Sequence, residues 1–406
     1  MIKIKKPKVV RLGGNSRLTS RVDIDGIAYD LWYEVDTRYE SALCSEKADA
    51  FVVGLLLYAI KNNHDIESEA PLTEDLKDSI ENEFLEAICQ KDKDAHRVKI
   101  SCPVIAPNWK NNVVRATGIS CGVDCLYTVC RRFIRNNKFS SKDYLVINNL
   151  HGECNDESTA AKSERFRYLV KKARAFSEAS GIDLIIGDTN FNSSDIPGLS
   201  FERYATFGNL FCCLCLQSML THYYVASAGS VDEFGYYLKQ GVFRTNVENL
   251  DLLTTSCLSS SAMRIVVDGL AARNEKVRYL AAEPLAWKHL DVCHVHADGQ
   301  VRNGTNDCPK CMRTVLELME LGPTVLDRFS EVFDVRYVKT HKGEYLAELI
   351  RGLMKKSLFA QQSWRNRGRM NFSYKDYICA SVIVARKIAK KVFRFGRKSS
   401  VFSSVG

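Results

Sequence analysis

The sequence predicts an α/β protein built on a parallel sheet with helices on both faces. The main observation is a regular alternation of β-rich and helical segments between residues 109 and 326, which is typical of parallel strands joined by crossover helices. Within this region, Val113–Ile134 reads as a short strand, a glycine-containing turn and a helix with one apolar face. A β-rich N-terminal segment and a helical C-terminal segment flank the region, so we expect three domains.

The composition is that of an ordinary globular protein of 406 residues, long enough for two or three hydrophobic cores. The net charge of +9 permits contact with nucleic acid or an anionic ligand without requiring it. The first residues, Met1–Lys6, lack the apolar region of a signal peptide, and the longest apolar run, Phe51–Ile60, is too short to span a membrane. Fifteen cysteines in this context are expected to be reduced thiols, and we expect a cytoplasmic protein without a membrane span.

Residues 1–108 form the predicted N-terminal α+β domain. Asp25-Gly26 is expected to turn a β-hairpin within Arg17–Val35. Helices are expected near Ala48–Asn62 and Thr73–Cys89, followed by a strand over Val98–Val104. No catalytic spacing appears here, so we expect a domain that packs on the central one or helps to close its site.

Residues 109–326 form the predicted central domain. The expected strands are Val113–Ala116, Tyr144–Asn149, Ile182–Ile186, Tyr223–Ala228 and Arg264–Val267. The expected helices are Asp124–Arg135, Thr159–Ala179 and Ala205–Leu220.

Ligands of open α/β sheets bind beyond the carboxyl ends of the strands, near the point where the strand order reverses. Asn148, Asn149 and His151 follow the second expected strand, and Asn190 follows the third. We expect His151 and Asn190 to contribute to a nucleotide site. The alternative is that they are ordinary loop residues.

Ser120-Cys121-Gly122-Val123-Asp124-Cys125 is the predicted anion-binding turn. A turn of small residues that leads into a helix presents backbone N–H groups and the positive end of the helix dipole to a phosphate. Asp124 at the helix start can cap those N–H groups and help to place Mg²⁺. The alternative is an ordinary glycine-containing turn between a strand and a helix.

This turn resembles the SGGxDS loop of the PP-loop ATP pyrophosphatases, the adenine nucleotide alpha-hydrolase superfamily with its HUP-like sheet. Ser120, Gly122, Val123 and Asp124 match, whereas Cys121 replaces a glycine and Cys125 replaces a serine. The resemblance implies ATP as cofactor, with phosphates held by Ser120–Cys125 and ATP cleaved to AMP and pyrophosphate. A thiol is a weak hydrogen-bond donor, so Cys125 weakens the expectation of turnover.

Cys293, Cys308 and Cys311 form a predicted Zn²⁺ site. Cys308 and Cys311 have the C-x₂-C spacing of zinc knuckles, and Cys293 precedes them by fifteen residues. His294 or His296 would supply the fourth ligand.

The cysteines, downstream of the Ser120 loop, are similar to the zinc-bearing 7-cyano-7-deazaguanine synthase (QueC-like) family, with one of its usual four cysteines replaced. The resemblance spans roughly residues 113–321 and points to a long relative. It implies an ATP-dependent ligase that activates a carboxylate or amide oxygen of a 7-deazaguanine or its protein or small-molecule conjugate. Arg273 and Lys276 resemble a basic element of long relatives and would contact ATP phosphates or a substrate carboxylate, with Asp124 and Ser120 completing the catalytic set. The alternative is a solvated helix start.

Residues 327–406 form the predicted C-terminal helical region, with helices over Gly343–Ser357 and Tyr374–Phe395. The second helix ends in a basic tail that includes Arg386, Lys387 and Lys390. Such a helix can bind nucleic acid or an acidic partner, and it can equally be a solvated face.

Three functions are therefore open. The first is a QueC-like enzyme whose adenylylated oxygen is displaced by a nitrogen nucleophile. The second is a PP-loop enzyme that modifies tRNA and uses the basic tail to hold it. The third is a nucleotide-binding or partner-binding protein whose catalysis has decayed.

Overall fold

The computed structural model describes residues 1–108, 110–135, 142–150, 159–191, 196–199, 201–239, 255, 257–293 and 308–401. Its contacts group into two compact units, residues 1–276 and 277–406. The sequence analysis placed three domains, with boundaries at 108 and 326. The N-terminal residues instead belong to the same unit as the central sheet.

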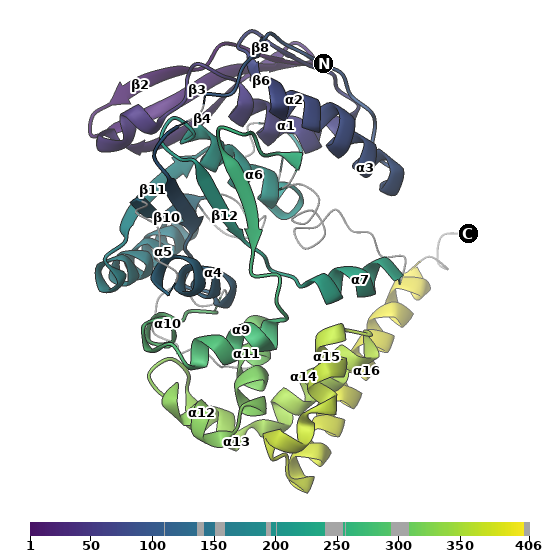
Figure 1. Ribbon diagram of the computed structural model, residues 1–406. Helices are drawn as coiled ribbons and strands as arrows, with labels where there is room; N and C mark the ends of the chain where they lie inside the picture. Colours follow the sequence, from purple (N-terminus) through teal and green to yellow (C-terminus); the bar gives the residue numbers. More distant parts are fainter. Residues whose placement is uncertain are drawn as a thin grey trace. The chain divides into compact units, whose positions relative to one another are not determined.

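The first unit contains the predicted parallel sheet (Figure 1). Its five parallel strands are β9 (Val114–Gly118), β10 (Lys142–Asn149), β11 (Asp183–Thr189), β12 (His222–Ala226) and β13 (Arg264–Asp268). They lie side by side in the order β13-β12-β9-β10-β11. Along the chain, β10 and β11 are thus added on one side of β9, and β12 and β13 are then added on its other side. The point of reversal lies between β9 and β12, where an open α/β sheet forms its ligand crevice.

Helices cover both faces of this sheet, as predicted. They are α4 (Val123–Val129), which continues through a π-helical turn to Ile134, α5 (Thr159–Ser180) and α6 (Phe201–Cys215). Tyr144 and Val146 of β10 join the large core that contains α6, whereas their neighbour Leu145 is buried outside that core. Alternate residues of one strand thus serve two cores, which confirms the α/β class.

The N-terminal strands extend the sheet beyond β11. They are β1 (Ile2–Ile4), β2 (Lys8–Leu12), β3 (Asn15–Ile24), β4 (Ile27–Asp36), β5 (Ile66–Ser68) and β7 (Ile100–Ser101). β4 pairs antiparallel with β11, so eleven strands of the described residues form one sheet. The hairpin between β3 and β4 turns at Asp25 and Gly26, both with positive φ, as the sequence predicted. β6 (Leu72–Thr73) and β8 (Val104–Ile105) pair separately.

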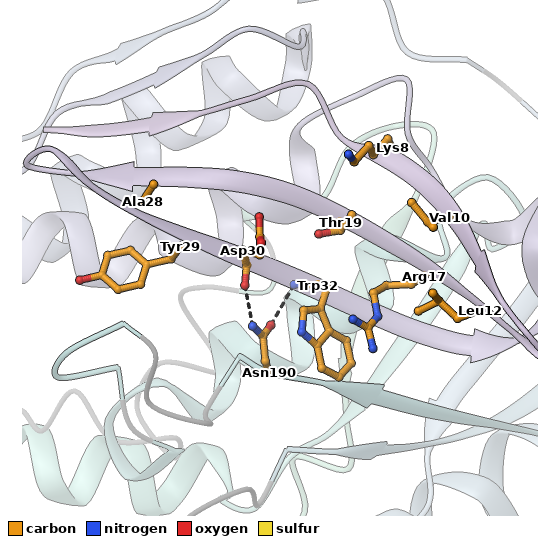
Figure 2. Close-up of a pocket in the computed structure, with 10 residues that line it drawn as sticks. All are labelled: Lys8, Val10, Leu12, Arg17, Thr19, Ala28, Tyr29, Asp30, Trp32 and Asn190. Atoms are coloured by element: carbon orange, nitrogen blue, oxygen red, sulfur yellow. Dashed lines mark hydrogen bonds between the residues drawn. The ribbon is translucent and has the colours of Figure 1, made fainter.

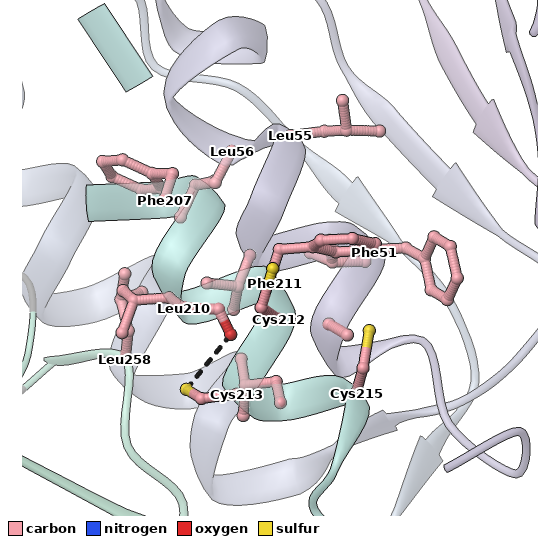
Figure 3. Close-up of a cluster of buried hydrophobic side chains, with 14 of the residues drawn as sticks. Phe51, Leu55, Leu56, Phe207, Leu210, Phe211, Cys212, Cys213, Cys215 and Leu258 are labelled. Carbon is pink, nitrogen blue, oxygen red and sulfur yellow. Dashed lines mark hydrogen bonds between the residues drawn. The ribbon is translucent and has the colours of Figure 1, made fainter. Parts of the chain in front are cut away.

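The N-terminal helix α1 (Asp49–Asn62) packs against α6 and merges the two regions into one core. Phe51 of α1 contacts Phe211 of α6 edge-on (Figure 3). Phe211 also stacks on Phe191. Gly54 allows this approach, because a Cβ there would lie 3.0 Å from Phe191 and 3.1 Å from Phe211. The predicted second helix is observed as α2 (Glu74–Ser79), a π-helical turn and α3 (Leu85–Lys91).

The second unit is helical throughout its described residues. Before it, the chain forms α7 (Val231–Lys239) in the first unit, and α9 (Arg273–Ala281) begins in the first unit and ends in the second. The helices that follow are α10 (Pro284–His289), α11 (Pro309–Glu320), α12 (Pro323–Arg328), α13 (Val335–Thr340), α14 (Lys342–Met354), α15 (Leu358–Arg365) and α16 (Tyr374–Val401). The close packing of α14 against α16 requires Gly343, since a Cβ there would lie 2.7 Å from Cβ of Cys379. Nowhere in the described part of the chain is a helix both long enough and apolar enough to cross a membrane.

We expect Phe211→Ala to lower the free energy of unfolding by about 3–5 kcal/mol, because it leaves a cavity between two aromatic rings. Urea titration followed by circular dichroism measures the loss. Ile27→Ala is the control, because Ile27 is 60% exposed. A loss below about 1 kcal/mol for Phe211→Ala would contradict the central place of this contact in the core.

Candidate nucleotide site and cysteine cluster

The turn between β9 and α4 has the backbone of a glycine-type anion loop. Cys121 has φ +57°, in the left-handed region that favours glycine, and it is fully buried. A side chain in this conformation costs about 1–2 kcal/mol. Cys121 occupies the position where the PP-loop pattern has its first glycine, so the backbone geometry agrees with the pattern although the residue differs.

Cys125 fills the inside of the turn. Its sulfur accepts a hydrogen bond from the backbone N–H of Ser120 at 3.3 Å, and its thiol donates to the carbonyl of Gly122 at 3.2 Å. Burial raises the pKa of Cys125, so the thiol stays protonated at neutral pH and remains a donor. The N–H of Ser120 is consequently occupied by sulfur, and the N-cap residue of α4 is Gly122, which has no side chain to cap the helix.

Asp124 carries an ion-pair cluster that connects the turn to α9. Its Oδ1 lies 2.8 Å from Nζ of Lys276, and its Oδ2 lies 3.2 Å from Nη1 of Arg273. Lys276 is fully buried and also donates to the carbonyl of Ser227 at 2.6 Å. The expectation that Asp124 caps backbone N–H groups is wrong, because both of its oxygens face cations.

A cavity of about 300 Å³ opens beside this turn at the point where the strand order reverses. Its lining combines Ser120, Asp124 and Cys125 of the turn with apolar side chains that include Ile147, Leu150 and Leu169. A lining of this mixed kind suits a ligand that has both a polar and an apolar part. The remaining described lining residues are Gly118, Ile119, Val146, Asn148, Asn209, Tyr223, Tyr224, Val225 and Ala226.

The described residues do not form a Mg²⁺ site. Magnesium prefers carboxylate oxygens and water, and Asp124 is the one acid among the described residues that line the cavity. Both of its oxygens are engaged by Arg273 and Lys276. The predicted role of Asp124 in placing Mg²⁺ therefore does not fit this arrangement.

Asn190 lies away from this cavity and supports the sheet instead. Its side chain accepts from the backbone N–H of Trp32 at 2.9 Å and donates to the carbonyl of Asp30 at 2.6 Å (Figure 2). It thus continues the β4 ladder past the end of β11 and lines a separate groove on the N-terminal sheet, where Arg17 stacks on Trp32. His151, the other residue expected from the strand ends, lies outside the described residues.

Cys293, Cys308 and Cys311 come together in the second unit, with their sulfur atoms within 4.8 Å of one another. Tetrahedral zinc with bonds of about 2.3 Å needs sulfur atoms about 3.8 Å apart, so small side-chain shifts complete the set. Cys308 sits at the N-cap of α11 and accepts from the N–H of Cys311 at 3.5 Å. The three thiols therefore fit a thiophilic metal. His294 and His296, the candidates for a fourth ligand, lie outside the described residues.

Two amides, Asn148 and Asn209, line the cavity. Asn148 is one of the residues that the sequence analysis placed at the carboxyl end of the second strand, where a ligand of such a sheet binds. Asn209 lies in the middle of α6, and no local signal in the sequence marks it.

We expect purified protein to contain about one metal ion per chain, bound by the three cysteines. Cys308→Ser should reduce this content to near zero, because two thiolates hold zinc weakly. Elemental analysis measures the metal and also distinguishes zinc from iron. Cys379→Ser is the control, because Cys379 is exposed and distant in sequence from the cluster. Wild-type protein that is stable and free of metal would contradict the prediction.

No family model and no curated protein sequence matches the chain. Among solved structures, the U34-tRNA thiolase NcsA from Methanococcus maripaludis, with its [4Fe-4S] cluster, is similar at 15% sequence identity and a TM-score of 0.29. The similarity covers 61% of this chain and 73% of that chain. Likeness at this level is too low to establish a common family or a common function.

Proposed function

We propose that the chain is an ATP-binding enzyme of the PP-loop type. The observation that carries the proposal is the cavity at the strand reversal, which is lined by Ser120, Asp124 and Cys125 of the turn before α4 and by apolar side chains. Arg273 and Lys276 lie behind this lining, where they pair with Asp124. Backbone N–H groups of Gly122 to Asp124 would hold phosphate oxygens, and the helix dipole would favour their charge.

Arg273 and Lys276 would act as phosphate clamps once ATP is present. In the free protein Asp124 balances their charge. A polyphosphate would compete with Asp124 for both cations, and the carbonyl of Ser227 would remain a partner of Lys276. Mg²⁺ would enter with the nucleotide, because phosphates and water can supply most of its ligands.

The reaction proposed is adenylylation. A carboxylate or amide oxygen attacks the α-phosphorus of ATP, the bond to the bridging oxygen breaks, and pyrophosphate leaves. A nitrogen nucleophile then attacks the activated carbon, and AMP leaves. The QueC-like resemblance supports a 7-deazaguanine, or a protein or small-molecule conjugate of it, as the activated substrate. The thiol cluster would serve as a structural zinc site that joins Cys293 to the start of α11.

A tRNA-modifying enzyme of the same type is the second candidate. The observation that favours it is the basic side of α16, where Arg386, Lys387 and Lys390 are all exposed. Such a surface suits a nucleic-acid backbone. An acidic protein partner would use the same residues.

A protein with decayed catalysis is the third candidate, supported by Cys125 inside the turn. The products of ATP incubation test the three candidates together. AMP and pyrophosphate formation that depends on a carboxylate or amide substrate supports the main proposal, and dependence on tRNA supports the second. ATP binding without AMP formation supports the third as a nucleotide-binding protein. Absence of ATP binding rejects both enzymes and leaves the partner-binding form of the third.

We expect Cys125→Ser to maintain or increase the affinity for ATP, because a hydroxyl is the stronger donor at the position facing the phosphates. An increase of up to about tenfold corresponds to one hydrogen bond. Isothermal titration calorimetry measures the affinity. Cys130→Ser is the control: Cys130 is buried on the same helical segment and is not among the residues that line the cavity. A lower affinity in Cys125→Ser alone would contradict the prediction that a hydroxyl serves the phosphates better than the thiol at this position.

A further inference from the structure

Asn148 presents an unused pair of N–H donors at the cavity. It stands at the carboxyl end of β10 and is partly exposed there. Its Oδ1 accepts a hydrogen bond from the hydroxyl of Tyr33 at 3.0 Å. No described residue accepts from its Nδ2, so the amide reaches the cavity as a donor.

Tyr33 belongs to β4 of the N-terminal sheet and is fully buried. Burial raises the pKa of Tyr33 well above its usual value, so the hydroxyl keeps its proton and acts as the donor to Asn148. In this arrangement the amide oxygen of Asn148 faces the hydroxyl of Tyr33, which directs its Nδ2 away from Tyr33.

Gly187 of β11 leaves the space for this contact. It pairs with Asn148 on one side and with Val35 of β4 on the other. A Cβ at this position would overlap both the hydroxyl of Tyr33 and Oδ1 of Asn148. The tyrosine thus reaches Asn148 across β11 only because that strand has no side chain there.

Asn209 of α6 offers the complementary group, a hydrogen-bond acceptor. Asn209 lines the same cavity, and its Nδ2 donates to the carbonyl of Ala205 at 2.9 Å. Its Oδ1 accepts from no described residue. One amide therefore offers a donor and the other an acceptor, next to the apolar side chains of Ile147 and Leu169.

We propose that Tyr33 is a positioning residue that holds Asn148 as a donor toward an acceptor atom on the heterocyclic base of the bound nucleotide. This inference rests on the proposed function. It gives the N-terminal sheet a part in ligand recognition, since the base end of the site is then oriented by β4 while the phosphate end is formed by the turn after β9.

The test compares ATP with inorganic tripolyphosphate, which lacks the base, by calorimetry. Tyr33→Phe should weaken ATP binding about threefold to tenfold, the range of one hydrogen bond, and leave tripolyphosphate binding unchanged. Asn148→Asp should weaken ATP binding at least as much, because it removes the donors and keeps the acceptor for Tyr33. Tyr39→Phe is the matched control, because its hydroxyl donates at 3.4 Å to the carbonyl of Leu184 and does not line the cavity.

The double variant Tyr33→Phe/Asn148→Ala should bind ATP as weakly as Asn148→Ala alone, since Tyr33 acts only through the amide. Equal weakening of ATP and tripolyphosphate by Tyr33→Phe would overturn the inference and assign Tyr33 a purely structural role. An unchanged affinity for ATP would overturn it as well. Wild-type protein that binds neither ligand would reject the proposed function, and this inference with it.

Discussion

The central position of β9 in the parallel sheet is the constraint on which the rest of the structure depends. β10 pairs with β9 on one side and β12 pairs with it on the other. The connections to these two strands lead away from β9 on opposite sides, so its carboxyl end is left open. The turn after β9 opens into that gap, and α4 begins there. The cavity, the helix start and the amides all meet at this place because strand order, more than any single residue, creates the gap.

Charge compensation sets the state of the site without ligand. Lys276 is an ammonium group with no solvent exposure, which is costly unless the charge is paired and hydrogen-bonded. Asp124 and the carbonyl of Ser227 provide that pairing. Under the proposed function, the same carboxylate that stabilises the buried lysine would compete with an incoming phosphate. Such a site would bind an anion by exchanging one partner for another, which would limit the affinity that its cations supply.

The N-terminal region is part of the central sheet, and its contacts explain why. β4 pairs with β11 over three residue pairs, and the side chain of Asn190 then continues the ladder with the backbone of Trp32 and Asp30. On the face of the sheet that packs against α6, α1 and α6 share one aromatic cluster. The N-terminal region therefore shares both a sheet and a core with the central strands and belongs to the same compact unit.

The sequence by itself determined the features that depend on short-range order. Alternation, helical periodicity and the Asp25-Gly26 turn predicted the α/β class, the five parallel strands and the hairpin, because each of these patterns involves residues that are close together in the sequence. Cys308 and Cys311 could likewise be paired from their spacing. Only the tertiary structure decided that β4 joins β11, that Asn190 supports the sheet, and that Asp124 faces Arg273 and Lys276. Each of these contacts joins residues about 150 positions apart in the chain. Local pattern carries no information about such pairings, because they are selected by which strands become neighbours in the sheet.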